Sequence, residues 1–152
     1  MSTAKETLGT VVKHLDSNSF KYDLDNEEMM IHLIWMGEDL PQPTLIHVDE
    51  IRDVVHIVSP IPGTFSEDDM VNAAIAVAAA NNGMVNGNFQ INMEDGTITF
   101  HITQYFKGGD FTDDDIHYLL SMAFSVTDLY NEKFFMLGRK MITLEEFLGQ
   151  IQ

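Results

Sequence analysis

The sequence predicts an α+β fold in which helices pack on a mainly antiparallel sheet. Helical spacing of apolar residues appears near both ends of the chain and in its middle, period-two alternation fills the stretches between, and short turns join the predicted strands. The predicted order of elements is α-β-β-β-α-β-β-α, followed by a short C-terminal helix. Because parallel neighbours need a long crossover, these short connections favour antiparallel pairing. The 152 residues are expected to form a single domain, residues 1–152.

The N-terminal segment has the pattern of an amphipathic helix. Thr3 and Glu6 have the spacing of a capping box, in which two side chains satisfy backbone N–H groups of the first turn. The apolar positions that follow are spaced i, i+3, i+4 and i+7, which places them on one helix face. They are Leu8, Val11, Val12 and Leu15.

Three strands are predicted next. Alternation over residues 20–25 indicates a strand with one buried and one wet face. The run Met29–Met36 is apolar except for His32, which predicts a central strand covered on both faces. Leu45–Val58 forms the third stretch. It is interrupted at Glu50–Asp53, where either a bulge or a turn fits the pattern.

A second helix and a hairpin follow. The helix is predicted over Asp68–Asn81, with Ser66 at its start and Asn82–Gly83 as its stop signal. It is unusually rich in alanine. Beyond it, two alternating segments flank Asp95–Gly96, which is a strong signal for a tight hairpin turn.

The C-terminal part is predicted to be helical. A long helix starts at Thr112 and ends at Gly138, and the acidic residues Asp113–Asp115 in its first turn suit the positive end of the helix dipole. Thr143 and Glu146 then form the capping box of a short final helix.

Charge and composition exclude several classes of partner. Eight basic residues against 24 acidic ones give a net charge of −16, which disfavours nucleic acid and anionic membranes. This acidity either serves solubility or steers a basic partner. The chain has no cysteine, and Met1–Thr10 lacks the apolar core of a secretion signal. We therefore expect a cytoplasmic protein that is not inserted in a membrane.

No catalytic pattern emerges from the sequence. Phosphate-binding glycine loops and the nucleophile elbow are absent, and the paired carboxylates lie in predicted turns or caps. We expect no enzyme activity, no cofactor and no metal site. Four histidines fall on predicted strands, where half-exposed side chains are the simplest expectation; the alternative is a metal site assembled from distant strands. They are His32, His47, His56 and His101.

Two features suggest binding surfaces instead. Apolar residues on the first helix, together with an adaptable methionine-rich segment beside the only tryptophan, are candidates for contact with a protein partner, although core filling is the alternative. These candidates are Leu8, Val11, Leu15, Trp35 and Met36.

The alanine-rich helix is the candidate for self-association in a homodimer. Its small side chains allow close approach of a second copy, although the helix fits equally between the sheet and the third helix. The candidate residues are Ala73, Ala76, Val77 and Ala80. On this hypothesis, Ala76→Glu should convert a dimer to a monomer without unfolding it.

Several motifs between Val54 and Phe106 carry a family resemblance. They are S-P-I-P at Ser59–Pro62, the alanine-rich run Ala73–Gly83, G-N-F at Gly87–Phe89 and D-G-T-I-T-F-H-I-T at Asp95–Thr103. This stretch resembles the bacterial YbjN-type family, which is named for a proposed role in sensory transduction. The helix from Thr112 to Leu137, with Asp128 and Tyr130, is consistent with the last helix of that family.

The resemblance implies a fold similar to type III secretion chaperones. Those proteins are small, acidic and usually dimeric, and they hold extended segments of client proteins. The resemblance implies no catalytic residues. The final helix, Thr143–Gln152, goes beyond the simple chaperone pattern.

The sequence as a whole predicts a non-catalytic protein-binding module of chaperone-like or regulatory type. A small-molecule or metal-responsive sensor is the alternative. The sensor hypothesis predicts a pocket between the sheet and the long helix, or a cluster of histidines in space.

Overall fold

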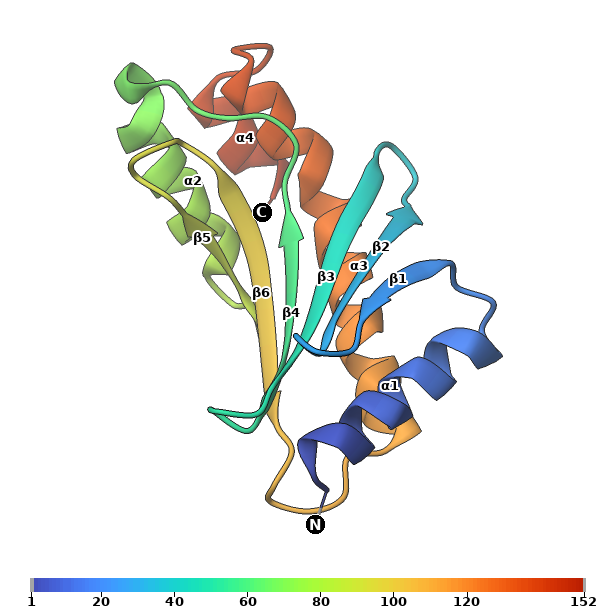
Figure 1. Cartoon of the computed structure of the whole chain (residues 1–152). Coiled ribbons are helices and arrows are strands. Elements are labelled where there is room, and N and C mark those ends of the chain that lie inside the picture. The colour runs from blue at the N-terminus through green and yellow to red at the C-terminus, as the bar shows by residue number, and fades with distance from the viewer. Residues whose placement is uncertain (1, 152) are drawn as a thin grey trace.

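Six strands form one sheet in the computed structural model, which describes residues 2–151 (Figure 1). The elements are α1 (Ala4–Ser17), β1 (Tyr22–Asp25), β2 (Met30–Met36), β3 (Pro41–Asp49), β4 (Val54–Pro60), a 3₁₀ turn (Glu67–Asp69), α2 (Met70–Asn81), β5 (Asn88–Ile91), β6 (Ile98–Tyr105), α3 (Asp113–Gly138) and α4 (Leu144–Gln150). The strand order is β1-β2-β3-β4-β6-β5, and every neighbouring pair is antiparallel. The predicted α+β class is confirmed.

The stretch from Leu45 to Val58 is two strands joined by a turn, so four strands precede α2 instead of three. The carboxylate of Asp49 makes the turn, because its Oδ1 accepts hydrogen bonds from the backbone N–H groups of Ile51 and Arg52 at 2.9 and 3.0 Å. Arg52 Nη1 also donates to Asp49 Oδ2 at 2.8 Å. These hydrogen bonds lower the pKa of Asp49 to about 2, and the bond from the Arg52 side chain makes the largest contribution.

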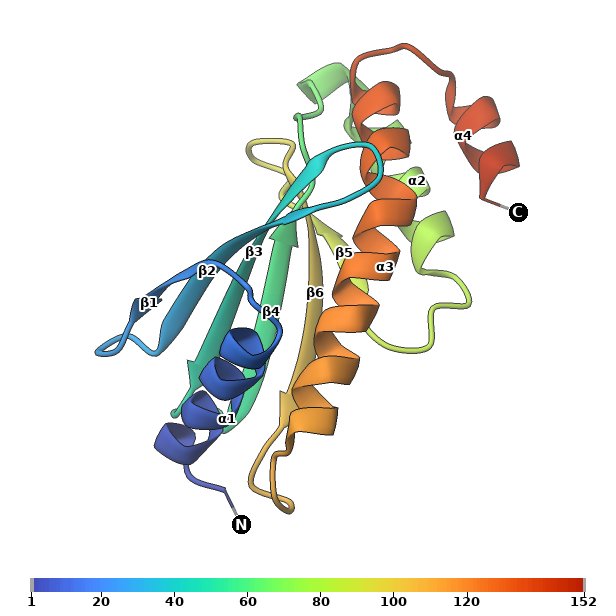
Figure 2. The same cartoon turned by 90° about the vertical axis from the view of Figure 1, so that its right-hand side faces the viewer.

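The helices cover one face of the sheet. Figure 2 shows α1 and α3 lying in front of the strands, and α2 packs on β5 and α4. The strand residues that face the helices are buried, and they form one core with the apolar stripes of α1 and α3. They are Ile31, Leu33, Ile46, Val48, Val55, Ile57, Phe89, Phe100 and Ile102. Within residues 2–151, none of the helices is both long and apolar enough to span a membrane.

Central strand β2 is covered on one face only, contrary to the prediction of two buried faces. Ile31 and Leu33 point into the core, whereas Ile34 and Met36 leave 67 % and 70 % of their surface exposed. An apolar run therefore did not imply burial on both sides here.

The local signals at the ends of elements are confirmed in part. Thr143 and Glu146 form the complete predicted capping box. Thr3 accepts from the backbone N–H of Glu6, but the Glu6 carboxylate accepts from the Thr3 hydroxyl and not from its backbone N–H. Ser66 makes no cap hydrogen bond at the start of the second helix. The β5–β6 turn contains Gly96 at φ +74°, and a side chain there would collide with the backbone of Phe65. Glycine is therefore required for the turn and for the close approach of the segment that leads into α2.

Candidate functional site

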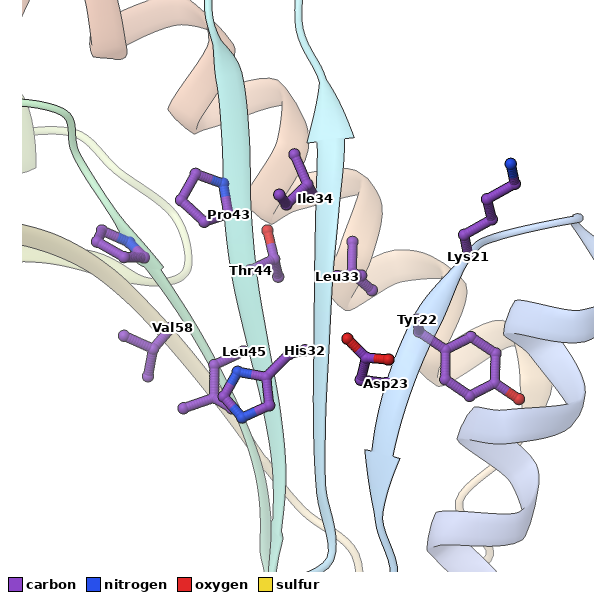
Figure 3. A pocket seen from close by; sticks show the side chains of 11 residues that line it. Lys21, Tyr22, Asp23, His32, Leu33, Ile34, Pro43, Thr44, Leu45 and Val58 are labelled. Atoms are coloured by element: carbon purple, nitrogen blue, oxygen red, sulfur yellow. The ribbon is translucent and has the colours of Figure 1, made fainter.

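The sheet face turned away from the helices is the candidate functional surface. It is formed by the alternate, outward-pointing residues of the strands, and we call it the open face. Its members on β2, β3 and β4 are His32, Ile34, Met36, Pro43, Leu45, His47, His56, Val58 and Pro60, and those on β5 and β6 are Asn88, Gln90, Thr99, His101 and Thr103. Figure 3 views part of this face, with α3 behind the strands.

A cavity of about 700 Å³ lies on the open face over β1 to β4 (Figure 3). Its apolar part is lined by outward side chains that the strand register sets side by side: Leu45 lies between His32 on β2 and Val58 on β4. Lys21 and Asp23 stand at the β1 side. Protein-ligand pockets typically measure roughly 300–1,000 Å³, so this volume suits a few side chains of a bound molecule.

Prolines shape the upper end of this cavity. Pro43 pairs with Ile34 on β2, but its nitrogen has no hydrogen to donate towards β4. The β3–β4 ladder accordingly begins at Leu45 and Val58. The carbonyl of Pro60 accepts its hydrogen bond from Gln42 Nε2 at 2.9 Å. The Gln42 side chain thus replaces a backbone hydrogen bond at the place where β3 and β4 separate.

Buried polar groups on the helix-covered side of the sheet hold β3 and β4 in position. Gln42 Oε1 accepts a hydrogen bond from Asn131 Nδ2 of α3 at 3.2 Å, and both residues are fully buried. Thr44 and Ser59, also buried, lie with their hydroxyl oxygens 3.3 Å apart. Among the described residues, every buried side-chain polar atom has a hydrogen-bond partner. Satisfied networks of this kind rigidify a site.

The β2–β3 hairpin is anchored to α3 at its tip. Trp35 stacks on Phe124 with ring centroids 4.7 Å apart and planes 5° from parallel. The backbone N–H of Glu38 donates to Asp128 Oδ1 at 2.7 Å, and Gly37 leaves the space that this carboxylate occupies. Trp35 therefore serves the fold on its inner side, and its neighbour Met36 is presented to solvent on the open face.

All four strand histidines lie on the open face, at half-exposed or exposed positions as predicted. His47 and His56 are direct neighbours across β3 and β4. His56 Nε2 lies 2.9 Å from His101 Nδ1, and Thr99 Oγ1 lies 2.7 Å from His101 Nε2.

Burial is the main cause that lowers the pKa values of both His56 and His101. The next cause is the neighbouring imidazole, which is that of His47 for His56 and that of His56 for His101. The lowered pKa values favour the neutral imidazoles at pH 7. Within residues 2–151, no group of three or more histidine, cysteine, aspartate or glutamate side chains is placed to hold a metal ion.

The partner contacts predicted on the first helix are core residues instead. Leu8, Val11 and Leu15 are 6 %, 0 % and 0 % exposed, because α1 turns its apolar face towards β3 and α3. This part of the predicted contact surface was wrong. Of the remaining candidates, half-buried Trp35 packs on α3 and only Met36 is well exposed.

The predicted self-association face on α2 is likewise internal. Ala73, Ala76, Val77 and Ala80 are buried within the same chain, against β5 and α4. The close approach allowed by small side chains is used there, so these residues offer no surface to a second copy. Val71 and Ile75 form the exposed side of α2. Because Ala76 is fully buried, we expect Ala76→Glu to destabilise the fold, in place of the expectation that it leaves the fold intact.

The cavity was not predicted, and neither was its place. The sensor hypothesis set a pocket between the sheet and the long helix, whereas the 700 Å³ cavity lies on the opposite face. The available signals were His32, the one polar residue of β2, and the prolines Pro43 and Pro60 on β3 and β4. They left open which face of the strands the helices cover.

Comparisons with known proteins place the chain by its fold alone. No protein-family model matches the sequence, and no curated protein sequence matches it. Among solved structures, YbjN from E. coli, described as a proposed transcription regulator, matches with a TM-score of 0.62 at 10 % identity, over 82 % of this chain and 87 % of that chain. The HopA1–SchA chaperone–effector complex matches with a TM-score of 0.49 at 10 % identity, over 97 % of this chain and 96 % of that chain.

The predicted similarity to YbjN is confirmed at the level of the fold. The fold of this chain is a six-stranded antiparallel sheet with helices on one face and an open second face. An identity of 10 % does not transfer residue roles, so the function must be argued from the open face itself.

Proposed function

We propose that this protein is a non-catalytic binding module that holds an extended segment of a partner protein on the open face. The cavity of about 700 Å³ over β1 to β4 carries this proposal. Its lining includes aliphatic and proline side chains from β2, β3 and β4 as well as Lys21, Asp23 and His32, which suits an extended chain whose alternate side chains enter it.

Exposed apolar surface supports an interaction at this place. Ile34 and Met36 are 67 % and 70 % exposed, and they adjoin Pro43 across the β2–β3 register. Contiguous apolar patches on a folded protein mark sites of association, because leaving them in water is unfavourable. Anchoring of the same hairpin to α3 keeps these side chains in position before a partner arrives.

The charge of the chain sets the chemistry of the partner segment. With 24 acidic and 8 basic residues, the protein attracts segments that contain lysine or arginine and repels nucleic acid. The partner segment is therefore basic as well as apolar. Long-range attraction of this kind accelerates encounter and weakens as salt screens it.

The regulator description of YbjN supports a regulatory role over an enzymatic one. A chain of net charge −16 is a poor direct ligand for DNA, so regulation here proceeds through a protein. We place this activity in the cytoplasm, in keeping with a chain that has no cysteine.

Selection from a random peptide library tests the proposal. Peptides are selected on the wild-type protein after subtraction on the variant Ile34→Ser, which removes apolar surface from the open face. We expect enriched sequences that combine lysine or arginine with aliphatic residues. Absence of enrichment, or enrichment of acidic sequences, would contradict the proposal.

A small-molecule sensor is the second candidate, because the cavity volume also falls within the range of small-ligand sites. Its ligand would bury aliphatic groups against Leu45 and Val58. A thermal-shift screen of metabolites separates the two functions: saturable stabilisation by one compound, without peptide enrichment, would favour the sensor.

A further inference from the structure

Two histidines on the open face form a pair beside the apolar cavity. His56 on β4 and His101 on β6 bring ring nitrogens Nε2 and Nδ1 within 2.9 Å, with ring centroids 5.1 Å apart and planes 33° apart. A separate cavity of about 330 Å³ adjoins both rings, and it is also lined by Asn88, Gln90 and Thr103. These two histidines lie on β4 and β6, so β4 contributes residues to both cavities, but no residue lines both of them.

We propose that His56 Nε2 and His101 Nδ1 together chelate a divalent transition-metal ion, with Zn²⁺ as the representative of the imidazole-binding class. Zinc–nitrogen bonds measure about 2.0–2.1 Å, so two nitrogens on tetrahedral zinc lie roughly 3.3 Å apart. The observed 2.9 Å separation needs to grow by only about 0.4 Å. Chelation requires side-chain rotations that supply this increase and turn both lone pairs towards one metal position, while the antiparallel β4–β6 pairing stays fixed.

A neighbouring hydroxyl prepares one ligand. Thr99 Oγ1 lies 2.7 Å from His101 Nε2. When that Nε2–H donates to the hydroxyl, Nδ1 keeps its lone pair and points it towards His56. Metal-binding histidines typically donate their second ring N–H in this way, which fixes both the tautomer and the ring orientation. The metal then takes the place of the hydrogen on His56 Nε2, and that proton moves to Nδ1 of the same ring, so that both ligands are neutral imidazoles.

The remaining coordination positions face the smaller cavity. A water molecule occupies about 30 Å³, so roughly 330 Å³ leaves ample room for water ligands. His47 is the neighbour of His56 on β3, but no third histidine or acidic side chain among residues 2–151 completes a three-ligand group. The site is therefore open and weaker than a closed four-ligand zinc site.

The class of ion follows from the donors. Two neutral imidazoles suit Zn²⁺, Cu²⁺ and Ni²⁺, whereas Mg²⁺ and Ca²⁺ require oxygen ligands. The asparagine and glutamine side chains at the rim supply no strong anionic donor. Ca²⁺ is accordingly the matched ion that should not bind here.

Zinc titration followed by calorimetry, with thermal unfolding in parallel, tests this site in the full chain. We expect saturable binding of one Zn²⁺, an increase in melting temperature with added Zn²⁺, and no response to Ca²⁺. The variants His56→Asn and His101→Asn should each lower zinc affinity by roughly tenfold or more. His32→Asn is the matched control, because His32 lies on the same face but outside the pair, and it should retain wild-type affinity.

Long-range nitrogen–proton NMR spectra of the histidine rings identify the ligating atoms. We expect zinc to shift His56 Nε2 and His101 Nδ1 and to leave the ring of His32 unchanged. Binding that survives in both His56→Asn and His101→Asn would place the ion elsewhere and overturn the proposal. Absence of saturable binding at millimolar Zn²⁺ would also overturn it. Neither outcome affects the peptide-binding proposal, which rests on the other cavity.

Discussion

The two faces of the sheet differ more than any other two regions of the molecule. Ile57 and Val58 are consecutive on β4, yet Ile57 is fully buried under the helices while Val58 lines the cavity on the open face. The inner face is aliphatic and aromatic, and the open face mixes aliphatic residues, prolines and four histidines. Packing with helices dictates the first face. The second face is free of that constraint, and it is the face on which we propose that a partner binds.

The largest expected effect comes from placing a charge on the covered side. Ala76→Glu puts a carboxylate without a partner at a fully buried position of α2, and it should destabilise the fold by about 3 kcal/mol or more. Val71→Glu on the exposed side of the same helix is the control and should change stability by less than about 0.5 kcal/mol. Urea unfolding followed by circular dichroism measures both. Equal effects would mean that the sides of α2 are not as described.

A pair of neighbouring truncations compares the faces on a single strand. Ile57→Ala opens a cavity in the core and should cost about 3 kcal/mol of unfolding free energy, whereas Val58→Ala should cost about 1 kcal/mol or less. The same unfolding assay provides the measurement. A larger loss for Val58→Ala would show that the open face is packed in solution, for example against a second copy of the chain.

A smaller effect is expected at the turn that separates β3 from β4. The hydrogen bonds from Arg52 and the turn lower the pKa of Asp49 from 3.8 to about 2. A lowered pKa stabilises the folded state above pH 3.8, and this contribution is lost as the pH falls through 2. Asp49→Asn should remove about 1 kcal/mol at pH 5, since solvent screens the exposed Arg52.

Comparison of the variant with wild type at pH 5 and pH 2 checks this assignment. The stability difference between the two proteins should shrink at the lower pH. A difference that is independent of pH would show that ionisation of Asp49 does not contribute.

Helix caps and turns were predictable from the sequence, whereas the sequence did not show which face of each helix or strand is buried in the core. The helix caps at Thr3 and Thr143 and the turn at Gly96 depend on residues within a few positions of one another, and all three are present, although only Thr143 forms a complete capping box. Leu8 on α1 and Ala76 on α2 were correctly seen as apolar helix positions, but the same pattern fits a core and an interface.

The histidine pair shows the same limit over a longer range. His56 and His101 are 45 residues apart in sequence, and their contact depends on the register between β4 and β6. Strand alternation placed each of them on a strand face, yet only the pairing of the strands brings their rings together. The cavity between Pro43 and Pro60 likewise depends on where the β3–β4 ladder begins.

The affinity of one peptide for two isoleucine variants tests the central claim most directly, provided that this peptide is selected on the wild-type protein without subtraction on either variant. Ile34 lies on the open face beside the cavity and is 67 % exposed, whereas Ile51 lies in the β3–β4 turn and is 88 % exposed. Truncating either to serine removes the same side chain with little effect on the core. We predict that Ile34→Ser weakens peptide binding by roughly tenfold, in line with about 1.4 kcal/mol of lost apolar contact, and that Ile51→Ser leaves it unchanged. Equal affinities of the two variants would contradict the assignment of the open face as the binding surface.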